Sequence, residues 1–216
     1  MTSPKKPLQD LSEIRNIMER STQFLSLSGL SGVFAGIYAL IAAWFVYYDF
    51  AERSNQLLSG YKDIVNADVN AELIADKINY AIMIGLIVLF LSLLTGFIFT
   101  KRKANKKEQS LWNSASKRML FNLAVPLLAG GIFCFMLIKQ NNFGLVAPAT
   151  LIFYGLALLN ASKYTLRDIQ YLGLLEIALG LVAAYFVGYG LIFWAIGFGV
   201  LHIVYGLSMY LKHDRN

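Results

Sequence analysis

The sequence has a single cysteine, Cys134, and only two histidines, and this scarcity limits the metal and disulfide chemistry available to it. One cysteine cannot form a disulfide within the chain or supply a Cys-based metal site. His213 lies in the tail beyond the last apolar stretch, far from His202, so bis-histidine haem ligation is not expected. We therefore predict no metal and no cofactor, and we interpret Cys134 as a small buried packing residue.

Charged residues are also scarce, since they make up 15% of the 216 residues while 57% are hydrophobic. A soluble domain would need more polar surface than this. Six apolar stretches approach the roughly 20 residues that a membrane-spanning helix needs. They lie at residues 24–48, 78–100, 119–138, 145–162, 170–187 and 190–211. The sequence thus predicts an all-α polytopic membrane bundle of six transmembrane helices within residues 24–211, the fourth and fifth being short.

The placement of the few charges predicts the topology. Segment 101–118 has seven basic residues and one acidic residue, whereas loop 49–77 has six acidic and three basic residues. The positive-inside bias places the first segment in the cytoplasm and the second outside, so both termini are expected in the cytoplasm, at the inner membrane of a bacterium. Nucleic-acid binding is the alternative for the basic loop; we do not favour it, because basic cytoplasmic loops are the default.

The ends of the chain are predicted to stay on the cytoplasmic side. Residues 1–23 carry Lys5, Lys6, Arg15 and Arg20 but have no apolar core, so we expect no cleavable signal peptide, and the first helix would act as an uncleaved signal. In this segment Leu8, Leu11, Ile14 and Met18 share one helical face, which predicts an amphipathic helix on the membrane surface. Disorder and docking to a partner are the alternatives. Residues 212–216 form a cytoplasmic tail.

Glycines in similar surroundings recur in three helical hairpins. The pairs are Gly36 with Gly96, Gly131 with Gly155, and Gly180 with Gly206. All three hairpins would enter from the cytoplasm, which suggests parallel repeats with an approximately threefold arrangement. Coincidence is the alternative, because small residues are common at helix contacts in membranes. Gly29, Gly32 and Gly36 also form one face of the first helix, suited to packing within the chain or to dimerisation.

Glu176 is the only carboxylate well inside an apolar stretch, and an ionisable residue there is a candidate functional residue. At a rise of 1.5 Å per residue, Glu176 and His202 lie at similar depth in an antiparallel hairpin. Three further residues would extend this pair into a polar layer: Asn122, Asn160 and Tyr205. The pair could hold or relay a proton. The alternative is a hydrogen-bonded group that only orders the bundle.

The stretch GLLEIALGL at 173–181, followed by a glycine turn and Val204-Tyr205-Gly206, resembles hairpins of HdeD-like bacterial membrane proteins. The resemblance implies a six-helix inner-membrane protein built from repeated hairpins and associated with acid resistance. It assigns a role to no residue. The long acidic outer loop and the basic inner loop depart from the compact pattern of that family.

Three classes of function are compatible with these features. We expect a non-enzymatic envelope or membrane-stress accessory factor that acts through contacts with lipids and with a protein partner or a second copy. The alternative is a small proton-linked transporter using Glu176 and His202. An enzyme ranks last, because only these two residues lie deep enough for chemistry, and the sequence has neither a Walker motif nor a nucleophile constellation.

Overall fold

The computed structural model describes residues 28–54, 71–106 and 111–214. These residues form helices and connecting turns, with no strand among them. Six helical segments of this part of the chain are long and apolar enough to cross a membrane. They span Gly29–Asp49, Ile78–Lys106, Ser114–Lys139, Phe143–Tyr164, Asp168–Tyr185 and Gly190–Lys212. The predicted all-α class is confirmed, with six helices long and apolar enough to span a membrane, while the N-terminal segment 1–23 lies outside the described residues.

Four spans are single α-helices, and the fourth and sixth spans are built from several pieces. The first three are α2 (Gly29–Ser54), α4 (Ala71–Lys106) and α5 (Ser114–Lys139). The fourth consists of η1 (Phe143–Leu145), α6 (Val146–Ala161) and η2 (Ser162–Tyr164), and the fifth is α7 (Asp168–Tyr185). The sixth contains α8 (Gly190–Trp194), the π-helix η3 (Ala195–Leu201), α9 (His202–Met209) and the π-helix η4 (Tyr210–Asp214).

Local sequence signals explain where these helices begin and turn. Asn113 precedes α5 and closes a capping box, in which its side chain accepts from the Ser116 amide at 2.7 Å while the Ser116 hydroxyl accepts from the Asn113 amide at 3.1 Å. The turn after α5 contains Asn141 at φ 57°, and the turn after α7 contains Gly188 at φ 101°. Both residue types tolerate this left-handed conformation, so the chain reverses tightly between the spans.

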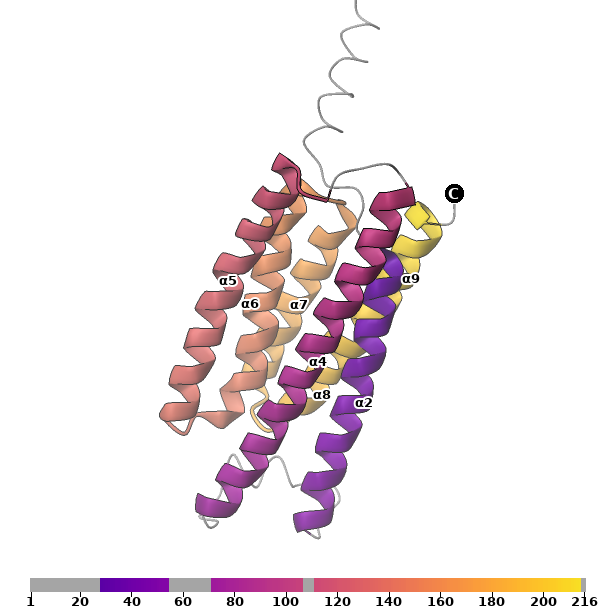
Figure 1. Cartoon of the computed structure of the whole chain (residues 1–216). Helices are drawn as coiled ribbons and strands as arrows, with labels where there is room; N and C mark the ends of the chain where they lie inside the picture. The colour runs from indigo at the N-terminus through magenta and orange to yellow at the C-terminus, as the bar shows by residue number, and fades with distance from the viewer. Residues whose placement is uncertain (1–27, 55–70, 107–110, 215–216) are drawn as a thin grey trace, which may run out of the picture.

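The six spans form two groups that meet at the sixth span (Figure 1). In one group α6 packs between α5 and α7, and in the other α2 packs between α4 and the segment formed by η3 and α9. The sixth span joins the groups, because α8 contacts α6 while α8, η3 and α9 all contact α7. An apolar cluster around Leu158, Leu172 and Met209 fills this junction.

Glycines allow close backbone contact within both groups. Gly155 on α6 faces Gly173 and Ile177 on α7, and Gly206 on α9 faces Gly29 on α2. Gly32 also lies on this second interface, where a Cβ atom would be 3.3 Å from the Cα of Gly206. By contrast, an added Cβ on Gly131 of α5 would meet nothing within 4 Å. Small residues are the expected means of helix association in lipid, since they let backbones approach closely.

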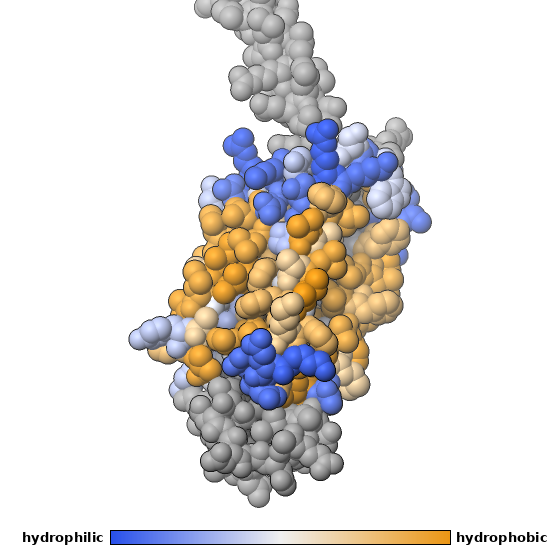
Figure 2. All heavy atoms as spheres, turned by 90° about the vertical axis from the view of Figure 1, so that its left-hand side faces the viewer, coloured by the Kyte–Doolittle hydropathy of each residue, from blue (hydrophilic) through white to orange (hydrophobic). Residues whose placement is uncertain are grey.

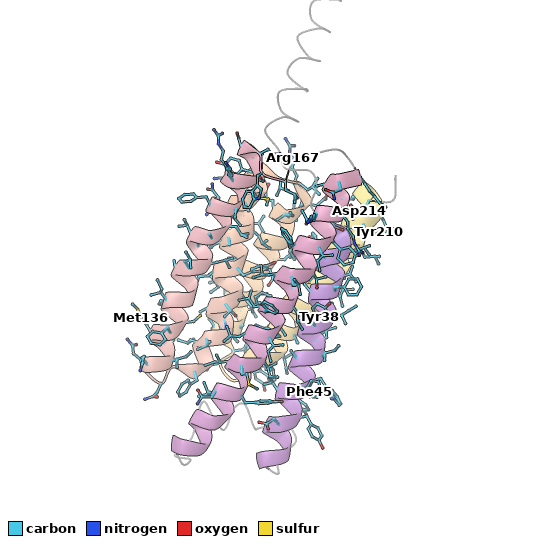
Figure 3. The ribbon with its side chains drawn as sticks, in the orientation of Figure 1. Tyr38, Phe45, Met136, Arg167, Tyr210 and Asp214 are labelled. Carbon is cyan, nitrogen blue, oxygen red and sulfur yellow. The ribbon has the colours of Figure 1, made fainter. Side chains whose placement is uncertain are left out.

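The face of the bundle drawn in Figure 2 is apolar around its middle and hydrophilic towards its ends. Large side chains point away from the helices, including Phe45 on α2 and Met136 on α5 (Figure 3), which are 52% and 53% exposed. A soluble monomer rarely exposes so large a continuous apolar surface. Together with the six helices that are long and apolar enough to cross a membrane, this surface is compatible with a membrane protein.

One carboxylate joins three spans at the end of the bundle where the chain terminates. Asp214 accepts hydrogen bonds from the Ser28 hydroxyl at 3.1 Å and from the Gly29 amide at 2.9 Å. Its other oxygen pairs with the ammonium group of Lys103 on α4. Because Gly29 is in the first turn of α2, Asp214 caps that helix from a distant part of the chain. The contact connects α2, α4 and the sixth span (Figure 3).

Candidate functional site

Glu176 lies in the middle of α7 and is completely buried, with 0% of its surface exposed. Within the described residues, neither carboxyl oxygen of Glu176 has a hydrogen-bond partner. A buried ionised carboxylate is costly unless hydrogen bonds or a counter-charge satisfy it, and in a membrane this cost is higher. Both oxygens of this buried carboxyl group thus lack hydrogen-bond partners among the described residues, and for this reason Glu176 defines the candidate site.

His202, at the start of α9, is held by two hydrogen bonds. Its Nδ1 lies 2.9 Å from the carbonyl oxygen of Gly197, and its Nε2 lies 2.7 Å from the hydroxyl of Tyr154 on α6. The carbonyl can only accept, so Nδ1 carries a hydrogen and donates it. In the neutral ring Nε2 then accepts from the Tyr154 hydroxyl. Both contacts are compatible with a neutral imidazole of defined tautomer.

The two predicted residues lie side by side across α7 and the sixth span. The distance from Glu176 Oε1 to His202 Nδ1 is 3.4 Å, which is within ion-pair range. The hydrogen of Nδ1 is engaged with Gly197, however, so the carboxyl group receives no hydrogen bond from the ring. The Nδ1 atom thus faces two acceptors, the Gly197 carbonyl at 2.9 Å and the Glu176 carboxyl group at 3.4 Å. The arrangement therefore places a proton donor within reach of Glu176.

The π-helical segment η3 provides both the carbonyl and the space for this contact. A π-helix bonds from residue i to i+5, which widens the turn and commonly marks functional sites. A Cβ atom on Gly197 would lie 2.5 Å from Glu176 Oε2 and 2.5 Å from a methyl group of Leu151. Only a glycine lets the backbone of η3 approach the carboxyl group this closely. Gly197 thus contributes to the site in two ways: its carbonyl oxygen accepts a hydrogen bond from His202, and its lack of a side chain leaves room for the Glu176 carboxyl group.

Aromatic rings surround the histidine. The ring of Phe198 lies 5.0 Å from that of Tyr154 and 5.8 Å from that of His202, and Trp194 lies 5.2 Å beyond Phe198. Tyr154 and His202 are themselves 5.3 Å apart, centre to centre. These rings fix the orientation of the imidazole and surround it with apolar surface. The hydrogen bonds of His202 are therefore made in a medium of low dielectric constant, where they are stronger than in water.

The other predicted polar residues lie elsewhere. Asn122 donates to the Arg118 carbonyl of its own helix at 2.9 Å. Tyr205 packs against the apolar cluster around Leu158 and Leu172. Asn160 is half-buried near the end of α6, and in the described part of the chain no hydrogen bond connects it to Glu176 or His202. The polar group at the site consists of Glu176, His202 and two residues that were not predicted.

Those two residues are Tyr154 and Gly197. Tyr154 directly precedes Gly155, a glycine of the hairpin motif, so the sequence already places Tyr154 within the fourth apolar stretch. Its hydroxyl reaches His202 only because α6 contacts the start of the sixth span. Gly197 contributes a backbone carbonyl, and no residue type in a sequence signals which carbonyl will accept a side-chain hydrogen bond.

Metal binding has little support at this site. No group of three or more His, Cys, Asp or Glu side chains that could hold a metal ion occurs among residues 28–54, 71–106 and 111–214. Cys134 is buried against Leu137, Ala149 and Val146 on the far side of α6. One carboxyl group, one imidazole and one phenol can exchange protons, and this is the chemistry that the arrangement offers.

No protein-family model, curated protein or solved structure matches this chain. The resemblance to HdeD-like proteins therefore remains an expectation drawn from the hairpin sequence around Glu176.

Proposed function

We propose that this chain is a small proton-linked membrane transporter in which Glu176 gains and releases the coupling proton. The single observation that carries the proposal is the fully buried Glu176 carboxyl group, which has no hydrogen-bond partner in the described residues and lies 3.4 Å from His202 Nδ1. Intramembrane carboxylates paired with histidine are the usual components of proton relays. The site thus favours the transporter over the accessory factor.

The geometry supports a specific relay. A proton that reaches Nε2 through the Tyr154 hydroxyl, 2.7 Å away, converts the ring to an imidazolium. When Glu176 is ionised, this ring can pass its Nδ1 hydrogen to Oε1, 3.4 Å away, which leaves the ring neutral with its hydrogen on Nε2. The Tyr154 hydroxyl accepts a proton from outside the site as it gives one to Nε2, so it stays neutral. The net result is one proton moved from the Tyr154 side to Glu176.

The proposed location is the inner membrane of a bacterium, with both termini in the cytoplasm. Its support is the positive-inside bias. Basic residues are exposed around the end of the bundle where α4 ends and α5 begins. They are Lys101, Arg102, Lys106, Lys117, Arg118, Lys163, Arg167 and Lys212. In this orientation Asp214 and the described end of the chain lie on the cytoplasmic side.

Infrared difference spectroscopy in lipid tests the proton site. The native protein is expected to show a carbonyl band of a neutral carboxylic acid that changes with pH, disappears in Glu176→Gln and shifts in His202→Ala. Asp168→Asn is the matched control, because Asp168 is on the same helix but pairs with Lys212 at its end. A band that is absent at every pH, or that is insensitive to both substitutions, would rule out the proposed relay.

Transport itself needs a second measurement. Proteoliposomes loaded with a pH-sensitive dye receive a pH jump, and we expect the native protein to equilibrate the interior faster than Glu176→Gln does. Equal rates for the native protein, Glu176→Gln and empty vesicles would mean that Glu176 moves no proton across the membrane. In that case the accessory-factor proposal, which relies on helix contacts, would take first place.

That second proposal has an observation of its own. The most hydrophobic stretch of α4, within Ile78–Lys106, has no buried residue, although α4 is the longest helix in the described part of the chain. Other spans bury up to 39% of the corresponding window. We also propose that the three hairpins are repeats. The support is that neighbouring hairpins meet through close glycine contacts, Gly155 with Gly173 between α6 and α7 and Gly206 with Gly29 between α9 and α2. An accessory factor would use the uncovered helix faces to bind its partner.

A further inference from the structure

Four basic residues lie together at the end of the bundle where α5 begins. Lys117 and Arg118 are near the start of α5, Lys163 is in η2, and Arg167 directly precedes α7. These elements are neighbours, because η2 packs against both α5 and α7. All four residues are exposed, and none of them forms an ion pair with a residue of the described segments. We call these four residues the basic patch.

The acidic residues at this end do not neutralise the basic patch. Asp214, which lies at the same end of the bundle as Arg167 (Figure 3), pairs with Lys103. Asp168 pairs with Lys212 at 3.0 Å. Asp168 and Asp214 are the two acidic residues that the structure describes at this end. Each of them therefore balances a lysine outside the basic patch, and the patch keeps a positive charge that attracts anions.

Exposed aromatic side chains continue from the basic patch toward the middle of the bundle. Phe121 follows Arg118 by three positions and is 69% exposed, and Tyr171 follows Arg167 by four positions and is 60% exposed. Residues at these spacings share one face of a helix. Trp112, just before α5, is 68% exposed, and both tryptophan and tyrosine prefer the depth of lipid headgroups. The charges of the basic patch thus border an apolar surface directly, as the hydrophilic end and the apolar middle do in Figure 2.

We propose that the basic patch binds the headgroup of an anionic phospholipid whose acyl chains lie along α5 and α7. The guanidinium groups of Arg118 and Arg167 can each donate two parallel hydrogen bonds to a phosphate group, while Lys117 and Lys163 add point charges. Clusters of four or more cations beside membrane spans are typical of anionic-lipid binding. The proposal is independent of the proton site and of the leaflet that the patch faces.

An anionic lipid accounts for both properties of this surface, its charge and its apolar border. A nucleic acid would neutralise the same four cations, but it has no hydrocarbon to lie against Phe121 and Leu120, which is 49% exposed. A zwitterionic phospholipid would cover these apolar side chains without bringing a net negative charge to the cations. We therefore expect the basic patch to bind an anionic phospholipid in preference to a zwitterionic one with the same acyl chains, and in preference to a nucleic acid.

Native mass spectrometry of the full chain, released from detergent micelles, tests this preference. Phosphatidylglycerol is expected to bind roughly fivefold or more tightly than phosphatidylcholine with the same acyl chains, since each cation near an anionic lipid contributes about fivefold in affinity. Replacing two cations together, Lys117→Gln with Arg118→Gln, should raise the dissociation constant for phosphatidylglycerol by roughly fivefold or more. The matched control is Lys139→Gln, which removes a charge from the other end of α5 and should leave this constant unchanged. All three side chains are exposed, so folding is retained.

Quenching of tryptophan fluorescence shows whether the lipid lies at the basic patch. In mixed vesicles, brominated phosphatidylglycerol should quench the native protein more than brominated phosphatidylcholine does. This difference should disappear in Trp112→Phe and decrease in Lys117→Gln with Arg118→Gln. Equal binding of the two lipids, or an equal loss of affinity in Lys139→Gln, would overturn the proposal. A single-stranded oligonucleotide that displaces phosphatidylglycerol from the native protein, and binds more tightly than the lipid, would assign the patch to nucleic acid and overturn it as well.

Discussion

Glu176 Oε1 and His202 Nδ1 are 3.4 Å apart, yet the hydrogen between them is held by the carbonyl oxygen of Gly197. Proximity alone therefore does not make this pair a salt bridge. The backbone carbonyl competes with the carboxyl group for one imidazole hydrogen, and the π-helical winding of η3 places that carbonyl there. The Nδ1 hydrogen thus lies between two acceptors, the Gly197 carbonyl of η3 and the Glu176 carboxyl group of α7.

Gly197→Ala tests the role of η3 directly. The new methyl group would lie 2.5 Å from Glu176 Oε2 and 2.5 Å from a methyl group of Leu151, so the ends of these two side chains must shift. We expect the free energy of unfolding to fall by about 1–3 kcal/mol, as in overpacked cores. Gly85→Ala is the matched control, because its methyl group would meet nothing within 4 Å. The control should be neutral or stabilise the protein by up to about 1 kcal/mol, since alanine favours a helix over glycine.

Both variants are compared by reversible unfolding in mixed micelles. Equal stabilities for Gly197→Ala and Gly85→Ala would show that the close approach of η3 to Glu176 is not needed for folding. A destabilised Gly197→Ala whose carboxyl band still responds to His202→Ala would separate packing from proton exchange.

Tyr154→Phe removes the hydroxyl that donates to His202 Nε2 and leaves the ring in place. The ring contacts with Phe198 are retained, so the expected loss of stability is small, about 0.5–1.5 kcal/mol for one hydrogen bond. The larger effect should be on the imidazole, which loses the partner that fixes its tautomer. Nitrogen NMR of labelled His202 is expected to show one tautomer in the native protein and a mixture in Tyr154→Phe. Identical spectra would mean that Gly197 alone selects the tautomer.

Hydropathy and the rise of a helix were enough to predict much of this architecture. The six apolar stretches became six helices, because only a helix satisfies its own backbone in lipid. The same reasoning placed Glu176 and His202 at one depth, and they are in contact. Depth says nothing about rotation around the helix axis, however. Tyr205 is only three residues from His202 but packs against apolar side chains, whereas Tyr154, from another helix, reaches the ring.

The interruption of the sixth helix could not be predicted for a different reason. The sequence Ala195–Leu201 is apolar and glycine-containing, like an ordinary span, and π-helical winding depends on what packs against it. Here Gly197 faces Glu176 and Gly199 faces Leu40, from opposite groups of helices. The widened turn fits between two neighbours that are distant in the sequence. Such a feature follows from tertiary packing and has no local signal.

Cys134→Ala is expected to be tolerated. The thiol is buried, and its only described polar contact is with the Val146 carbonyl at 3.9 Å. Removing one sulfur atom from this apolar contact should cost about 1 kcal/mol. In the folded native protein the thiol should react with a maleimide far more slowly than after unfolding in detergent. Rapid labelling in the folded state would contradict the packing of α5 against α6.

Asp214 provides the last prediction, because one carboxylate makes two separable contacts. Asp214→Asn keeps an oxygen that can accept from the Gly29 amide but loses the charge that pairs with Lys103. Asp214→Ala loses both. We expect the asparagine variant to cost less than about 1 kcal/mol and the alanine variant about 1–2 kcal/mol, the usual range for a helix cap. Hydrogen exchange of the first turn of α2 distinguishes them, since only Asp214→Ala should accelerate it strongly. Equal acceleration in both variants would mean that the ion pair with α4, and not the cap, fixes the start of α2.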